Sequence, residues 1–77
     1  MRRELVREKT LVDMLFNAGH EGGEITEALE EMGPAVPFSG PHKQGGEGYR
    51  LPNVAEWFML PPEEIRDWAE EIEEGAR

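Results

Sequence analysis

The sequence predicts a mainly helical domain of the winged-helix type, with about four short helices and a two-stranded β wing. Apolar residues recur at helical spacing in four segments, and glycine and proline separate these segments from one another. Between the second and third segments, two short apolar arms flank a glycine-rich loop, which is typical of a hairpin. The 77 residues lack cysteine, so we expect one domain over residues 1–77, with a single small core and no disulfide bonds.

The first predicted helix covers residues 4–18. Its apolar residues follow the i, i+3, i+4, i+7 rule: Leu11, Met14, Leu15 and Ala18. The segment Thr10–Asp13 also matches a capping box, so the helix has an alternative start at Leu11, which would leave residues 1–9 as a basic arm. Gly19 is predicted to end the helix, because glycine readily takes the left-handed conformation found at helix C-termini.

The second predicted helix covers residues 24–32 and follows a glycine-rich turn at residues 20–23. Its apolar positions repeat the same spacing: Ile25, Ala28, Leu29 and Met32. Proline at position 34 cannot continue the hydrogen-bond ladder, so the helix ends before it. Two short helices joined by such a turn are compatible with a helix-turn-helix, and equally with any small αα-hairpin.

A hairpin, which we call the wing, is predicted from two arms at residues 35–38 and 48–51. Pro37 limits the first arm to an edge strand, because proline has no N–H to donate to a neighbouring strand. The connection at residues 39–48 is longer than a tight turn and rich in glycine, so we expect a flexible loop. Phe38 and Tyr49 are expected to face one another across the pair of arms.

Two further helices are predicted after the wing. Pro52 suits the first turn of the third helix, and the stretch up to Leu60 is the most apolar in the chain. The fourth helix begins near Pro62 and carries an apolar stripe: Ile65, Trp68, Ala69 and Ile72. We expect the core to centre on the large aromatic side chains Trp57, Phe58 and Trp68. Residues 75–77 are predicted to form a tail.

The order of these segments resembles a known architecture. Helix, turn, a second helix ending EEMG-PAVP, a glycine-rich loop and YRLPNVAEWFM resemble the winged helix-turn-helix of phage terminase small subunits and excisionase-type proteins, over about residues 10–60. In a competing alignment, VAEWFMLPPEEIRDWAEE is similar to the helix-turn-helix of MerR-type regulators, with the fourth helix as the DNA reader. Either resemblance implies a small winged-helix domain that binds DNA.

The chemistry of the predicted DNA-reading helices departs from these families. Base reading needs Arg, Lys, Asn or Gln, whereas the second helix offers Glu24, Thr26, Glu27, Glu30 and Glu31. The fourth helix is equally acidic, with one favourable i, i+4 pair between Arg66 and Glu70. The residues that match phosphate contacts lie in the arm and the wing: Arg2, Arg3, Arg7, Lys43 and Arg50. They are the candidate nucleic-acid-binding residues.

Charge points to a different partner. The chain holds 17 Asp and Glu against 8 Lys and Arg, and its net charge of −9 repels phosphate and attracts cationic surfaces. We therefore expect an acidic face that binds a basic protein. Its predicted residues come from the fourth and second helices: Glu63, Glu64, Asp67, Glu70, Glu71, Glu73, Glu74, Glu27, Glu30 and Glu31.

No catalytic or cofactor site is predicted. Ser39 is the only serine and has no base and orienting acid beside it, so a Ser-His-Asp site is not expected. His20 and His42 lack the spacing of a zinc site, and the glycine loop lacks the phosphate-binding pattern of nucleotide enzymes. The absence of cysteine, of a signal-peptide pattern and of a long apolar run indicates a cytoplasmic protein.

The sequence therefore favours a non-enzymatic, small acidic interaction protein of the phage type. It would bind a nucleic-acid-handling protein and modulate or inhibit it, with carboxylates that imitate the phosphates of nucleic acid. The alternative is a winged-helix DNA-binding regulator of the excisionase kind, acting through the wing and the basic arm. A third hypothesis is an accessory or structural subunit whose charge serves solubility.

Overall fold

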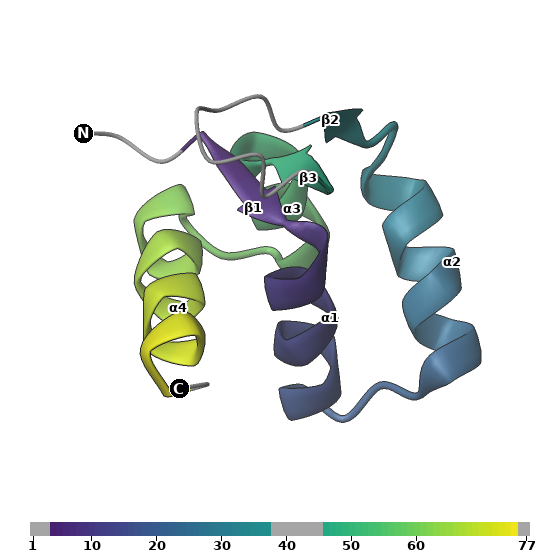
Figure 1. The fold of residues 1–77 in the computed structure, drawn as a ribbon, viewed down its shortest axis with the longest axis horizontal. Coiled ribbons are helices and arrows are strands. Elements are labelled where there is room, and N and C mark those ends of the chain that lie inside the picture. The colour runs from purple at the N-terminus through teal and green to yellow at the C-terminus, as the bar shows by residue number, and fades with distance from the viewer. Residues whose placement is uncertain (1–3, 38–45, 76–77) are drawn as a thin grey trace.

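The structure, a computed structural model, describes residues 4–37 and 46–75 (Figure 1). Its elements in chain order are β1 (Leu5–Arg7), α1 (Glu8–Asn17), α2 (Gly22–Met32), β2 (Val36–Pro37), β3 (Glu47–Arg50), α3 (Leu51–Phe58) and α4 (Pro62–Gly75). The prediction of a mainly helical domain with four helices and a small sheet is confirmed. Several residues named above lie outside the described ranges: Arg2, Arg3, Phe38, Ser39, His42 and Lys43.

The sheet has three antiparallel strands in the order β1-β3-β2, so the predicted two-stranded wing is extended by a strand from the start of the chain. Val6 lies opposite Tyr49, and Val36 lies opposite Gly48. Residues 4–7 were predicted to be helical, or part of an arm, and both predictions are wrong. Their burial alternates, with Val6 buried between two half-buried neighbours, which is the period of a strand.

α1 starts at Glu8, between the two predicted starts. The capping box predicted at Thr10–Asp13 is not formed, because Thr10 lies inside the helix and its hydroxyl donates to Oε2 of Glu73 at 2.9 Å. The predicted end is confirmed: Gly19, at φ +99°, is left-handed. The N–H of Gly19 donates to the carbonyl of Phe16, and the N–H of His20 donates to that of Leu15. These two bonds form a Schellman motif.

α2 starts at Gly22, two residues before the predicted boundary. The reason is a capping box that the sequence reading missed: the Glu21 side chain accepts from the backbone of Glu24, and the Glu24 carboxylate accepts from the N–H of Glu21. The box satisfies N–H groups that would otherwise be unpaired in the first turn. At the other end, the side chain of Asn53 donates to the carbonyl of Met32 at 3.1 Å and ties α2 to α3.

The core is aliphatic rather than aromatic. Its fully buried large side chains come from five of the elements: Val6, Leu11, Met14, Leu15, Met32, Val54 and Ile65. Trp57, Phe58 and Trp68 are half-buried and pack against this cluster, so the prediction that they form its centre is wrong. α3 has only eight residues, and the side chains that it buries are Leu51, Val54 and Ala55.

α1 occupies the middle of the molecule. Figure 1 shows α4 on one side of α1 and α2 on the other, with α3 behind and the sheet at one end. α4 packs on α1 and α3, and α2 packs on α3 and α1. The two acidic helices therefore lie on opposite sides. None of the helices within residues 4–37 and 46–75 combines the length and the apolar character of a transmembrane segment.

Tyr49 is expected to make the fold sensitive to alkaline pH. Its side chain is buried, and burial, followed by the negative charges of Glu8 and Glu47, raises the pKa of the phenol above its usual value. The folded state thus favours the neutral phenol. The stability this contributes is complete below the unfolded pKa of about 10, and falls as the pH rises from there through the raised folded value.

Tyr49 is the only tyrosine in the chain, so the ultraviolet absorbance of tyrosinate follows this one group. We expect titration of the folded protein to begin at a higher pH than titration in denaturant. Thermal unfolding scans should show stability falling above about pH 10, and Tyr49→Phe should remove that part of the slope. Equal titration midpoints in the folded and unfolded protein would contradict the buried position of this side chain.

Candidate functional site: the acidic row of α4

The outward face of α4 carries a continuous row of carboxylates. Ile65 and Ala69 are buried on the inward face, and Arg66, Trp68, Ile72 and Glu73 beside them are half-buried, so that the remaining positions face solvent. Six exposed carboxylates make up what we call the acidic row: Glu63, Glu64, Asp67, Glu70, Glu71 and Glu74. Each of them has another member of the row three or four residues away, which is the spacing of neighbours on a helix surface.

The density of this charge is comparable to that of a nucleic-acid strand. The eleven-residue step from Glu63 to Glu74 corresponds to a rise of about 16 Å, at about 1.5 Å per residue. Six charges over this length give about one per 3 Å, whereas one DNA strand carries one phosphate per about 3.4 Å. A regular helix also holds the carboxylates in a fixed order. The row is therefore a rigid anionic track about half as long as the roughly 34 Å of one DNA turn.

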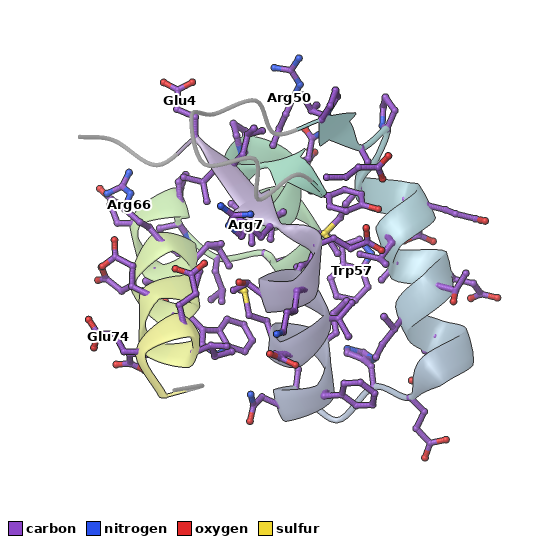
Figure 2. All side chains as sticks on the ribbon, viewed as in Figure 1. Glu4, Arg7, Arg50, Trp57, Arg66 and Glu74 are labelled. Carbon is purple, nitrogen blue, oxygen red and sulfur yellow. The ribbon has the colours of Figure 1, made fainter. Side chains whose placement is uncertain are left out.

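The acidic row is not neutralised from within α4. Arg66 is half-buried and lines a cleft of about 550 Å³ with residues of the sheet end, among them Leu5 and Arg50. The predicted ion pair between Arg66 and Glu70 is not found within the described part of the chain. Nε of Arg66 is buried and has no hydrogen-bond partner there. Figure 2 shows Arg66 near the sheet end of α4 and Glu74 near the opposite end.

Helix stability accounts for only part of the row. Glu63 and Glu64 lie in the first turn of α4, where negative charge meets the positive end of the helix dipole. Glu74 lies in the last turn, where a carboxylate is unfavourable and no basic residue is present, whereas Glu70 and Glu71 lie before that turn. The helix dipole therefore opposes Glu74 and does not account for Glu70 and Glu71.

Glu73, which was predicted to be part of the partner-binding face, has a different position. It is half-buried and accepts the hydrogen bond from Thr10, whose side chain is 5% exposed. This bond links the start of α1 to the end of α4, 63 residues apart. Its role is to fix α4 against α1, and we do not include it in the acidic row.

The carboxylates predicted on the second helix form a separate surface. Glu27, Glu30 and Glu31 are exposed on α2, which lies across the molecule from α4 (Figure 1). Glu31 also accepts a hydrogen bond of 2.7 Å from Nε1 of Trp57, a labelled residue that Figure 2 shows between α1 and α2. The ten predicted partner-binding residues therefore do not form one face, and the acidic row is the larger continuous part.

His20 belongs to a ring cluster and shares a hydrogen bond with an α2 carboxylate. Nδ1 of His20 lies 3.3 Å from Oε1 of Glu24, and its ring meets the edge of Trp57 at 5.4 Å between centroids. Trp57 contacts Phe58 in the same way, and Phe58 contacts Trp68. Among the residues that the structure describes, no group of three or more His, Asp or Glu side chains could hold a metal ion.

The described candidate nucleic-acid-binding residues lie at the sheet end. Arg7 is in β1, and Arg50 is exposed at the end of β3, directed away from the body of the molecule in Figure 2. Arg7 lines a groove of about 720 Å³ together with Val12, Gly46 and charged residues of both signs: Glu8, Lys9, Asp13 and Glu47. Carboxylates thus alternate with the cations, which weakens any attraction for a phosphate backbone.

One surface was missed by the sequence reading. Leu60 was counted with the apolar stretch of the core, but it is 37% exposed, and the preceding Met59 is 88% exposed. The signal was present in the Pro61-Pro62 pair, which prevents α3 from continuing and leaves the side chains of Met59 and Leu60 in the connection to α4.

Comparisons of the chain with protein-family models, with curated proteins and with solved structures give no significant match. The resemblance to terminase small subunits, excisionases and MerR-type regulators stays a prediction.

Proposed function

We propose that this protein is a non-enzymatic interaction domain whose acidic row binds a basic, nucleic-acid-handling protein in place of nucleic acid. The observation that carries the proposal is the row itself: six exposed carboxylates at phosphate-like density on one helix face. A partner that recognises a phosphate backbone presents Lys and Arg along a groove. The row offers these cations an alternative set of acceptors, and its occupation of the groove would inhibit or modulate the partner.

The charge of the other surfaces supports a protein partner over DNA. The exposed face of α2, which the terminase-like resemblance would place in the major groove, carries Glu24, Glu27 and Glu30 and would repel a duplex. The fourth helix, the reader in the MerR-like alignment, carries the acidic row. The same charges that oppose DNA binding raise the local concentration of a basic protein.

The test is a displacement assay with two matched variants. A panel of purified basic DNA-binding proteins, each loaded with a fluorescent duplex, is titrated with the chain, and release of the duplex is followed by anisotropy. Glu70→Lys with Glu74→Lys reverses two charges of the acidic row. Glu27→Lys with Glu30→Lys reverses two exposed charges on α2 and changes the net charge by the same amount.

We expect the wild-type chain to displace the duplex from a member of the panel, at least about tenfold less well at high salt, because screening shortens the range of the attraction. The α4 double variant should lose at least about tenfold in affinity, or 1.4 kcal/mol, whereas the α2 double variant should lose much less. Equal losses would show that net charge alone governs binding. A mobility shift of the duplex by the chain itself at low salt would favour the DNA-binding alternative.

A further inference from the structure

The turn between α3 and α4 holds an apolar corner in solvent. Met59 is 88% exposed and Leu60 is 37% exposed, and both lie between the last residue of α3 and the prolines that open α4. Phe58, directly before them, is half-buried and meets the ring of Trp68 on α4 at 5.1 Å. This ring contact joins the two sides of the turn, so Met59 and Leu60 are presented from a fixed support.

The backbone of the turn makes methionine an unusual choice at position 59. α3 ends in the same Schellman motif as α1: the N–H of Met59 donates to the carbonyl of Glu56, and the N–H of Leu60 donates to that of Ala55. The left-handed residue of this motif is normally glycine, as Gly19 is in α1. Met59 takes the left-handed conformation at φ +61° despite its side chain.

Packing within the chain does not explain Met59. Because the side chain is 88% exposed, it buries almost no apolar surface that could offset the strain of the backbone. Strained residues that persist in a structure are concentrated at functional sites. A long, unbranched thioether is also the side chain best able to adapt to the apolar surface of another molecule.

The surroundings of the corner define the chemistry of its partner. Glu56 precedes the corner, Glu63 and Glu64 follow it, and all three are exposed. No Lys or Arg occurs between Leu51 and Ile65. The corner is therefore an apolar centre within an anionic border that continues into the acidic row. A second copy of the chain would bring like charges together at a net charge of −9 each, which opposes self-association.

We propose that Met59 and Leu60 anchor a cationic amphipathic helix of the partner protein. The apolar face of that helix contacts the two side chains, and its Lys and Arg residues pair with Glu56, Glu63 and Glu64. Helices of this kind present apolar residues at i, i+3, i+4 and i+7, with cations at the remaining positions. This inference rests on the proposed function, because it assigns the anchor of the same basic partner.

The test uses two synthetic peptides of identical Leu and Lys composition. In one, the leucines follow helical spacing, and in the other the order is scrambled, so the two peptides differ in amphipathicity and not in charge. The chain is labelled with ¹³C at its methionine methyl groups. Met14 and Met32, which are 0% and 1% exposed, serve as internal controls for the signal of Met59.

We expect the amphipathic peptide to shift the Met59 methyl signal and to leave those of Met14 and Met32 in place. The preference for the amphipathic over the scrambled peptide should fall by about tenfold in Met59→Gly, the loss typical of an anchor residue, and should persist in Met59→Leu. Glycine suits the left-handed position, so the melting temperature of Met59→Gly should be no lower than that of the wild type. Loss of binding would then not be due to unfolding.

Two results would overturn this inference: an unchanged peptide preference in Met59→Gly, or a Met59 signal that does not respond to the amphipathic peptide. Either result leaves the proposed function standing if Glu70→Lys with Glu74→Lys still weakens displacement of the duplex. Conversely, an intact peptide preference alongside a failed displacement assay would retain the corner as a binding site and remove the nucleic-acid-mimic proposal.

Discussion

Ile65→Ala is expected to leave a large fraction of the chain unfolded at room temperature. Ile65 is fully buried on the inward face of α4, the helix that packs on both α1 and α3. Removing three buried carbon atoms and leaving a cavity costs about 2–5 kcal/mol. A single core of this size supplies only about 3–5 kcal/mol of net stability, so the substitution removes most of it.

Urea titrations followed by circular dichroism and tryptophan fluorescence measure this effect. Ile72→Ala is the matched control, because the same atoms are removed from the same helix at a position that is only half-buried. We expect it to cost about half as much or less, since the transfer and cavity terms both shrink with exposure. Similar losses at the two positions would mean that α4 does not dock on α1 and α3 through Ile65.

The two Schellman motifs are expected to respond in opposite directions to exchange of their left-handed residues. Gly19→Ala places a Cβ at φ +99°, where L-residues are strained, and it should destabilise the fold by about 1–2 kcal/mol. No atom lies within 4 Å of the added Cβ, so the whole loss comes from the backbone. Met59→Gly relieves the equivalent strain in α3 and should stabilise by about 0.5–1 kcal/mol.

Gly23→Ala is the control for this pair. It makes the same chemical change as Gly19→Ala, also with no atom within 4 Å of the new Cβ, but inside α2 at an ordinary helical conformation. Alanine is preferred over glycine there, so the midpoint of urea unfolding should rise, by up to about 1 kcal/mol in free energy. If Gly19→Ala and Gly23→Ala both stabilise the fold, Gly19 does not have the left-handed conformation described at the end of α1.

The helices could be predicted because their apolar spacing is local information. Ile25, Ala28 and Met32 mark α2, and Ile65 and Ala69 mark α4, and all five are buried. The acidic row followed from the same periodicity, since the positions between the apolar ones face solvent. Glu73 could have been separated from the row, because it follows the buried Ala69 by four residues and lies on the same side of α4.

The features that escaped prediction depend on partners far apart in the chain. Residues 5–7 form a strand because β3, more than 40 residues later, lies beside them. Three residues are too few to reveal the alternation of apolar and polar positions that is typical of a strand. The bond from Thr10 to Glu73 is likewise long-range. The half-buried state of Trp57 reflects competition for a core too small to enclose several large rings, which composition alone does not reveal.

The short strands at the two margins of the sheet bear on the solubility of the chain. β1 has three residues, and β2 has two, one of which is Pro37 with no N–H to donate. Within residues 4–37 and 46–75, neither margin offers the long, flat row of unpaired backbone groups that templates edge-to-edge aggregation. A neighbouring molecule therefore finds few free backbone groups with which a strand of its own could pair. Contacts with other molecules are then made by side chains, such as the exposed methionine at the corner.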